Sequence, residues 1–107
     1  YEIGTHSRKI IVPDNLEHKE DFRIRKSDID SNGHVNNTVY VALASEFIPE
    51  GLEMERLRVE YRKEAHYGDT LEAWISAQGK SIFVVLRKAG TEDMAVIEMI
   101  FENEVKD

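Results

Sequence analysis

The most constraining feature of this 107-residue sequence is a segment, residues 35–48, that is apolar on nearly every side. Apolar residues recur in it at four-residue spacing, which predicts a helix. Such a helix should be buried, because it keeps no polar face for water. Asn36 or a neighbour is expected to cap its start, and Pro49 and Gly51 to end it. The recurring apolar residues are Val35, Val39, Leu43 and Phe47.

Five segments around this helix have the patterns of strands. Apolar and charged side chains alternate over residues 20–25 before the helix, and over residues 57–61 and 71–77 after it. This period of two is expected of half-buried strands. Residues 82–86 and 94–101 are mostly apolar runs of strand length. The order β-α-β-β-β-β predicts an α+β domain, in which a curved antiparallel sheet of about five strands wraps round one buried central helix.

The domain organisation leaves two points open. The apolar run at 82–86 fits a central strand, or a strand whose outer face is covered by a second sheet or subunit. Residues 1–18 are polar and irregular and are interpreted as an arm or linker, which leaves residues 19–107 as the domain. Because the sequence begins at Tyr1 rather than at Met, either an N-terminal piece was removed or the chain is a fragment of a longer one.

Composition and charge exclude several classes of protein. The absence of cysteine rules out disulfides, a thiol nucleophile and cysteine-based metal sites. The net charge of −7, from 14 basic and 21 acidic side chains, disfavours nucleic acids and anionic membranes as partners. No apolar run approaches the roughly 20 residues of a membrane helix, so a cytoplasmic location is expected.

The segment at 28–37, Asp-Ile-Asp-Ser-Asn-Gly-His-Val-Asn-Asn, carries the densest group of reactive side chains. It lies where a strand meets the predicted helix, whose N-terminal N–H groups could stabilise a developing oxyanion. Gly33 would allow a substrate close to the backbone, and a carboxylate or His34 could activate water. Two other interpretations stay open: an ordinary strand-to-helix turn, or a metal site of His34, Asp28 and Asp30 that lacks the usual spacing of a histidine pair.

This segment, followed by Tyr40, resembles the signature of hotdog-fold thioesterases. The later segment Leu57–Ala65 and the pair Gly68-Asp69 fit the same family. The resemblance is closest to the acyl-acyl carrier protein (acyl-ACP) thioesterases of plants and bacteria, in their C-terminal hotdog half. It spans roughly residues 22–101, and it implies a single hotdog domain.

The resemblance also implies the site residues. Three catalytic residues come from the loop and one carboxylate from the strand that follows the helix. Some relatives have Cys after that carboxylate, where this chain has Ala65. The catalytic residues are Asp30, Asn32, His34 and Glu64, and the expected substrate-binding residues are Gly33, Val35 and Asn36.

The implied reaction is hydrolysis of an acyl thioester. Glu64 or Asp30 would activate water, with His34 assisting or orienting. Asn32 would hold the water or the carbonyl, and the amides near residues 33–35 would meet the oxyanion. No cofactor and no metal are expected.

The implied function is release of a fatty acid from acyl-ACP in fatty acid biosynthesis. A stand-alone acyl-CoA thioesterase and a non-catalytic acyl-binding or assembly module are the alternatives. The expected partners are acyl carrier protein and a second hotdog unit, in a homodimer or in a longer chain. Because the carrier is acidic, docking needs a local basic patch. The candidates are Arg23, Arg25 and Lys26, or Arg56, Arg58, Arg62 and Lys63, although these side chains would also fit ordinary solvated strand faces.

The position of Glu64 conflicts with simple alternation. If Leu57 and Tyr61 face the helix, Glu64 faces away from it. A β-bulge would resolve the conflict. An active site between two hotdog units would also resolve it, and this is the explanation that we favour from the sequence.

Overall fold

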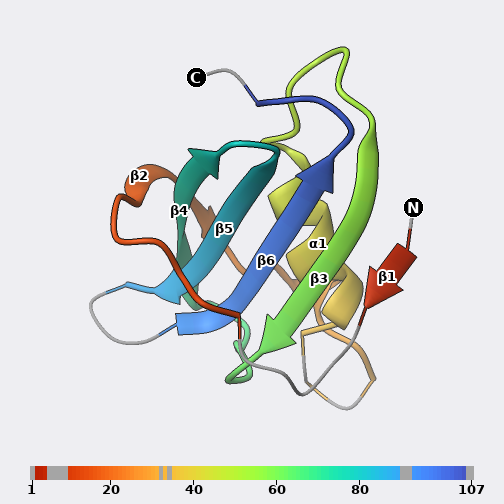
Figure 1. Ribbon diagram of the computed structural model, residues 1–107. Coiled ribbons are helices and arrows are strands. Elements are labelled where there is room, and N and C mark those ends of the chain that lie inside the picture. The colour runs from red at the N-terminus through yellow and green to blue at the C-terminus, as the bar shows by residue number, and fades with distance from the viewer. Residues whose placement is uncertain (1, 5–9, 32, 34, 90–92, 106–107) are drawn as a thin grey trace.

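The computed structural model describes residues 2–4, 10–31, 33, 35–89 and 93–105. All its strands lie in one sheet, in the order β1-β3-β6-β5-β4-β2, and helix α1 packs against one face of that sheet (Figure 1). The elements are β1 (Glu2–Gly4), β2 (Glu17–Arg23), the 3-10 helix η1 (Lys26–Asp28), α1 (Asn37–Ser45), β3 (Met54–Tyr61), β4 (Thr70–Gln78), β5 (Ser81–Lys88) and β6 (Asp93–Phe101).

The predicted α+β fold is confirmed. Five strands, β3-β6-β5-β4-β2, pair antiparallel, and their order along the chain is β-α-β-β-β-β as expected. Strand β1 adds a short sixth member that pairs parallel to β3 at the edge. Among the residues that the structure describes, no helix combines the length and the apolar character needed to cross a membrane.

Helix α1 begins with the predicted cap. The Asn36 side chain accepts hydrogen bonds from the backbone N–H of Thr38 at 3.0 Å and from its hydroxyl at 2.9 Å. Only Tyr40 and Ala44 of the helix are buried, whereas Ala42 is exposed. The expected burial is therefore limited to the side that faces the sheet, because a single sheet layer covers only one side of a helix.

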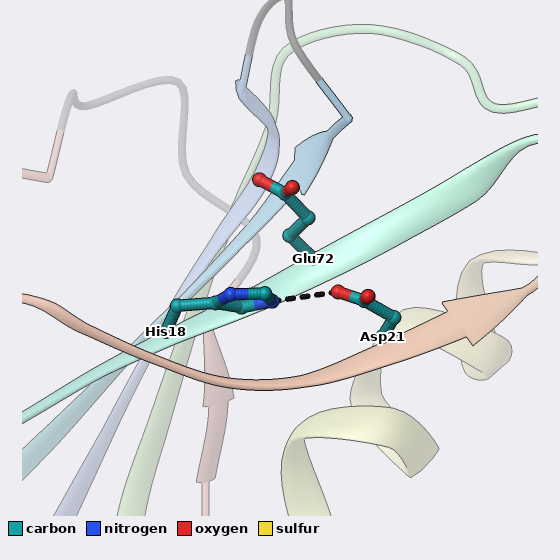
Figure 2. Close-up of side chains that lie close together, drawn as sticks. All are labelled: His18, Asp21 and Glu72. Atoms are coloured by element: carbon teal, nitrogen blue, oxygen red, sulfur yellow. Dashed lines mark hydrogen bonds and ion pairs between the residues drawn. The ribbon is translucent and has the colours of Figure 1, made fainter.

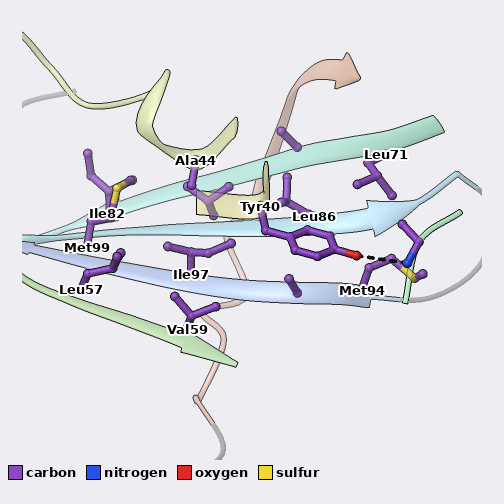
Figure 3. Packing of buried hydrophobic residues seen from close by; sticks show 14 of the residues in the cluster. Tyr40, Ala44, Leu57, Val59, Leu71, Ile82, Leu86, Met94, Ile97 and Met99 are labelled. Carbon is purple, nitrogen blue, oxygen red and sulfur yellow. Dashed lines mark hydrogen bonds between the residues drawn. The ribbon is translucent and has the colours of Figure 1, made fainter. Parts of the chain in front are cut away.

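The main core lies between α1 and the inner face of the sheet (Figure 3). Alternating residues of the strands fill it, as the period-two patterns predict. Tyr40 and Ala44 supply the helical side of this core. The largest fully buried strand residues in it are Leu57, Leu71, Val84, Leu86, Ile97, Met99 and Phe101.

The outer face of the sheet carries a second apolar cluster. Ile10 is only 3% exposed and packs with Val85 and Val96 of the two central strands. The segment that leads into β2 crosses in front of β5 and β6, on the face opposite α1 (Figure 1). Part of the segment interpreted as an arm therefore covers the apolar strand 82–86. Two further residues of that segment, Glu17 and His18, belong to β2.

Candidate active site

A pocket of about 610 Å³ lies where the start of α1 meets the end of β3. Two of the predicted catalytic residues, Asp30 and Glu64, lie on its wall. They come from separate parts of the chain, the loop before the helix and the segment after β3. The remaining lining residues are Val35, Asn36, Asn37, Tyr40, Tyr61, Arg62 and Lys63.

The backbone around Asp30 is held by two contacts. Its neighbour Ile29 forms an antiparallel bridge with Val35. The N–H of Gly33 donates to the carbonyl of Asp30 at 3.0 Å. Gly33 has a φ of 79°, a left-handed conformation that glycine adopts without strain. The bridge and this hydrogen bond together fix the backbone that presents the Asp30 side chain.

The N-terminus of α1 also faces the pocket, through Asn36 and Asn37. A helix N-terminus carries partial positive charge, and its first N–H groups point outward. The N–H of Asn36 donates to the carbonyl of Asp28 at 3.1 Å, which ties the loop to the start of the helix. Because the N–H groups of Asn36 and Thr38 already donate within the protein, it is the partial positive charge of the helix end that can stabilise negative charge on a bound substrate.

Glu64 reaches the pocket because the regular alternation of side chains along β3 ends after Tyr61. The N–H groups of Arg62 and Lys63 both donate to the carbonyl of Met94, at 2.9 and 3.2 Å. Two successive donors to one acceptor are the hydrogen-bond pattern of a β-bulge, which re-aims the side chains that follow it. The bulge accounts for the position of Glu64 within one domain, so the site between two units that we favoured is not required to explain it.

Two tyrosines line the pocket between the helix and β3. Their ring centroids are 5.7 Å apart. Burial raises the pKa of the Tyr40 hydroxyl, the backbone hydrogen bond from Ala65 opposes this rise, and the negative charges of Glu64 and Asp69 add to it. Partial burial, and then Tyr40, raise the pKa of Tyr61. Both phenols therefore stay neutral at ordinary pH.

The structure brings some of the predicted site residues together and does not test others. Val35 and Asn36 line the pocket with Asp30 and Glu64, whereas Gly33 lies outside its lining. The other two predicted catalytic residues, Asn32 and His34, fall outside the described residues.

Asp28 does not line the pocket. Its carboxylate accepts a hydrogen bond from the N–H of Arg25 at 2.8 Å and forms an ion pair with the Arg25 guanidinium at 3.4 Å. This carboxylate is thus engaged within the turn before the loop. The metal site considered from the sequence would also need His34, which the structure does not describe.

Five pocket residues were not among the predicted site residues: Asn37, Tyr40, Tyr61, Arg62 and Lys63. A signal for Tyr40 was present, because it follows Asn36 by four residues and Asn37 by three. That helical spacing places all three on one face. No comparable signal marked residues 61–63, since strict alternation splits them between two faces.

The two candidate basic patches differ in their surroundings. Arg58 forms an ion pair with Glu98 at 2.7 Å, and Arg62 contacts Glu60 at 2.7 Å and Asp93 at 3.3 Å. This patch is therefore bound to carboxylates of the sheet, as the alternative of ordinary strand faces expects. Arg23, Arg25 and Lys26 are exposed and directly precede the pocket loop, and Arg25 among them pairs with Asp28 at 3.4 Å.

A further group of potential metal ligands lies on the outer side of β2 and β4: His18, Asp21 and Glu72 (Figure 2). A register shift between His18 and Glu20 turns His18 and Asp21 to the same side. The His18 ring hydrogen-bonds to Asp21 at 2.6 Å and stacks on Trp74, whose indole N–H donates to Glu72 at 3.1 Å. These contacts join the edge strand to β4 and lie outside the pocket lining.

Comparison with known proteins identifies the family. Residues 12–104 match the family described as the acyl-ACP thioesterase C-terminal domain. The chain is 31% identical, over 75 residues, to the oleoyl-acyl carrier protein thioesterase, chloroplastic, of Coriandrum sativum. The match covers 66% of this chain and 20% of that protein, so the chain spans about a fifth of the curated relative's length.

Solved structures support the same assignment. The acyl-ACP thioesterase from Bacteroides thetaiotaomicron matches 87% of this chain over 42% of its own, with a TM-score of 0.72 and 25% identity. The 12:0-ACP thioesterase from Umbellularia californica matches 91% of this chain over 40% of its own, with a TM-score of 0.78 and 22% identity. The predicted single hotdog domain is thereby confirmed. The chain belongs to the acyl-ACP thioesterase family and corresponds to its C-terminal hotdog domain.

Proposed function

We propose that this chain is the catalytic hotdog of a thioesterase that releases a fatty acid from acyl-ACP, in fatty acid biosynthesis. The family is one of thioester hydrolases, which supports the reaction class. The observation that carries the proposal is the pocket in which Asp30 and Glu64 share a wall with the N-terminus of α1. A carboxylate base beside the positive end of a helix dipole is a combination that suits thioester hydrolysis.

The reaction would proceed by attack of water on the thioester carbonyl carbon. Glu64 or Asp30 takes a proton from the water as the new C–O bond forms. The partial positive charge at the N-terminus of α1 stabilises the oxyanion, which then collapses as the C–S bond breaks. The proton passes to the departing thiolate, which yields the free acid and the carrier thiol. In this proposal His34 assists or orients, and Asn32 holds the water or the carbonyl.

Acyl carrier protein is the proposed partner, and the exposed basic residues Arg23, Arg25 and Lys26 are the proposed contact. They directly precede the loop that carries Asp30, so a carrier bound to them would deliver its thioester close to the pocket. Their charge complements an acidic carrier despite the net charge of −7. We place the reaction in the cytoplasm.

Thiol release separates this function from its alternatives. The chain is incubated with lauroyl- and oleoyl-ACP and with the two matching acyl-CoAs, and the free thiol is measured. We expect faster release from acyl-ACP. Faster release from acyl-CoA would instead favour a stand-alone acyl-CoA thioesterase. Binding of acyl-ACP by a folded chain, without thiol release, would favour a non-catalytic acyl-binding module.

A further inference from the structure

One buried hydrogen bond links helix α1 to the peptide that follows Glu64. The N–H of Ala65 donates to the hydroxyl oxygen of Tyr40 at 3.1 Å, across 25 residues of sequence (Figure 3). Ala65 is fully buried and Tyr40 is 3% exposed. A buried N–H without a partner is costly, so this contact fixes the orientation of the peptide between residues 64 and 65.

The orientation of this peptide decides where Glu64 points. Glu64 follows β3 by three residues, after the bulge, and has left the strand ladder. The N–H of Lys63 donates to the carbonyl of Met94 in β6, and the N–H of Ala65 donates to Tyr40 in α1, so backbone hydrogen bonds hold the chain on both sides of Glu64. The plane of the 64–65 peptide sets the backbone angle ψ of Glu64. It thereby sets the direction in which the carboxylate enters the pocket.

We propose that Tyr40 is a positioning residue, which holds the Glu64 carboxylate in its working orientation through the Ala65 N–H. The inference rests on the proposed thioesterase function. Tyr40 is well suited to the task, because it packs in the main core and lines the same pocket as Glu64. The family resemblance implies catalytic roles for residues of the loop before α1 and for Glu64. The role of Tyr40 follows instead from its hydrogen bond to Ala65.

The test is a double-mutant cycle with Tyr40→Phe and Glu64→Gln, measured as thiol release from lauroyl-ACP. In the parent chain we expect Tyr40→Phe to lower kcat about tenfold and to change KM less than twofold, since binding surfaces are kept while the base is misdirected. In the Glu64→Gln background, Tyr40→Phe should cause no further loss, because the group on which it acts is already gone. A merely structural role would lower activity in both backgrounds.

Two control variants separate an effect on the orientation of Glu64 from an effect on the stability of the fold. Tyr67→Phe makes the same chemical change two residues from Ala65 at an exposed ring, and should leave kcat unchanged. Val59→Ala weakens the core without touching the 64–65 peptide, and should lower the unfolding temperature while kcat per folded molecule stays constant.

The outcomes are distinguishable. An equal loss from Tyr40→Phe in both backgrounds, or an unchanged kcat in the parent chain, overturns the positioning role and leaves the proposed function standing. If the parent chain itself releases no thiol from any acyl thioester, the proposed function fails and the positioning role fails with it.

Discussion

At the scale of single residues, the two pocket tyrosines make the free energy of unfolding depend on pH in the alkaline range. The folded state raises the pKa of Tyr40 and Tyr61, with burial as the first cause in each case. A free tyrosine loses its proton near pH 10. Above that pH the unfolded chain binds fewer protons than the folded chain, so the free energy of unfolding falls as pH rises.

Thermal unfolding between pH 8 and pH 11 checks this coupling. The unfolding temperature should be level up to about pH 9.5 and should fall above about pH 10. Tyr40→Phe should make that fall shallower, because one of the titrating groups is gone. A fall equally steep in the variant would show that Tyr40 does not carry the effect.

Some of the residues at the pocket could be predicted from the sequence, and others could not. The motif pointed to Asp30 and Glu64, and the structure places both at one pocket. The cap at Asn36 was predictable as well, because a short polar side chain before an apolar helical run satisfies its first N–H groups. The position of Tyr40 beside Ala65 was not, since the pair is 25 residues apart and joined only in the folded state.

At the scale of elements, the segment before β2, residues 10–16, covers part of the outer face of the sheet. Ile10 is buried against Val85 and Val96, and its N–H donates to Glu60 at 2.6 Å. Ile11, the next residue, is 88% exposed. The two neighbours therefore form a matched pair, in which the same substitution tests a buried and an exposed side chain.

Ile10→Ala should lower the free energy of unfolding by about 2 kcal/mol, at the low end for a buried Ile because the segment can partly close the gap. Ile11→Ala should change it by less than about 0.5 kcal/mol. Urea unfolding followed by Trp74 fluorescence measures both, since Trp74 packs against the same cluster. Equal effects of the two substitutions would argue against this packing.

The strands illustrate which elements a local pattern predicts. Alternation in residues 57–61 and 71–77 marked β3 and β4, because side chains of a strand alternate between core and solvent. The pairing of β1 with β3 carries no local signal, as it joins residues more than 50 positions apart. The bulge after Tyr61 was one of two explanations that the sequence left open for Glu64, because the choice depends on one carbonyl of β6.

At the scale of the whole molecule, the chain spans about two fifths of its solved relatives from Bacteroides and Umbellularia. Among the described residues, α1 is covered on the side that faces the sheet; Ala42 is exposed, and Val39, Val41 and Leu43 are only half-buried although they pack against the main core. An apolar helix side of this kind is stabilised by a covering surface. We therefore expect two copies of the chain to pair.

Light scattering after size-exclusion chromatography checks this expectation. The measured mass should be twice that of one chain at micromolar concentration. Ala42→Glu should lower the mass toward that of one chain if the side of α1 that carries Ala42 forms the contact, because a charge would be buried there. A single-chain mass for the parent protein at all concentrations would contradict the pairing.

The central claim is that Asp30 and Glu64 work together at one pocket to hydrolyse an acyl thioester. The most direct test compares thiol release from lauroyl-ACP by the parent chain, Asp30→Asn and Glu64→Gln, with Asp21→Asn as a matched carboxylate outside the pocket. Removing a group that activates water should lower kcat at least about 100-fold. The account predicts such a loss for both pocket variants and none for Asp21→Asn; full activity in both pocket variants would contradict it.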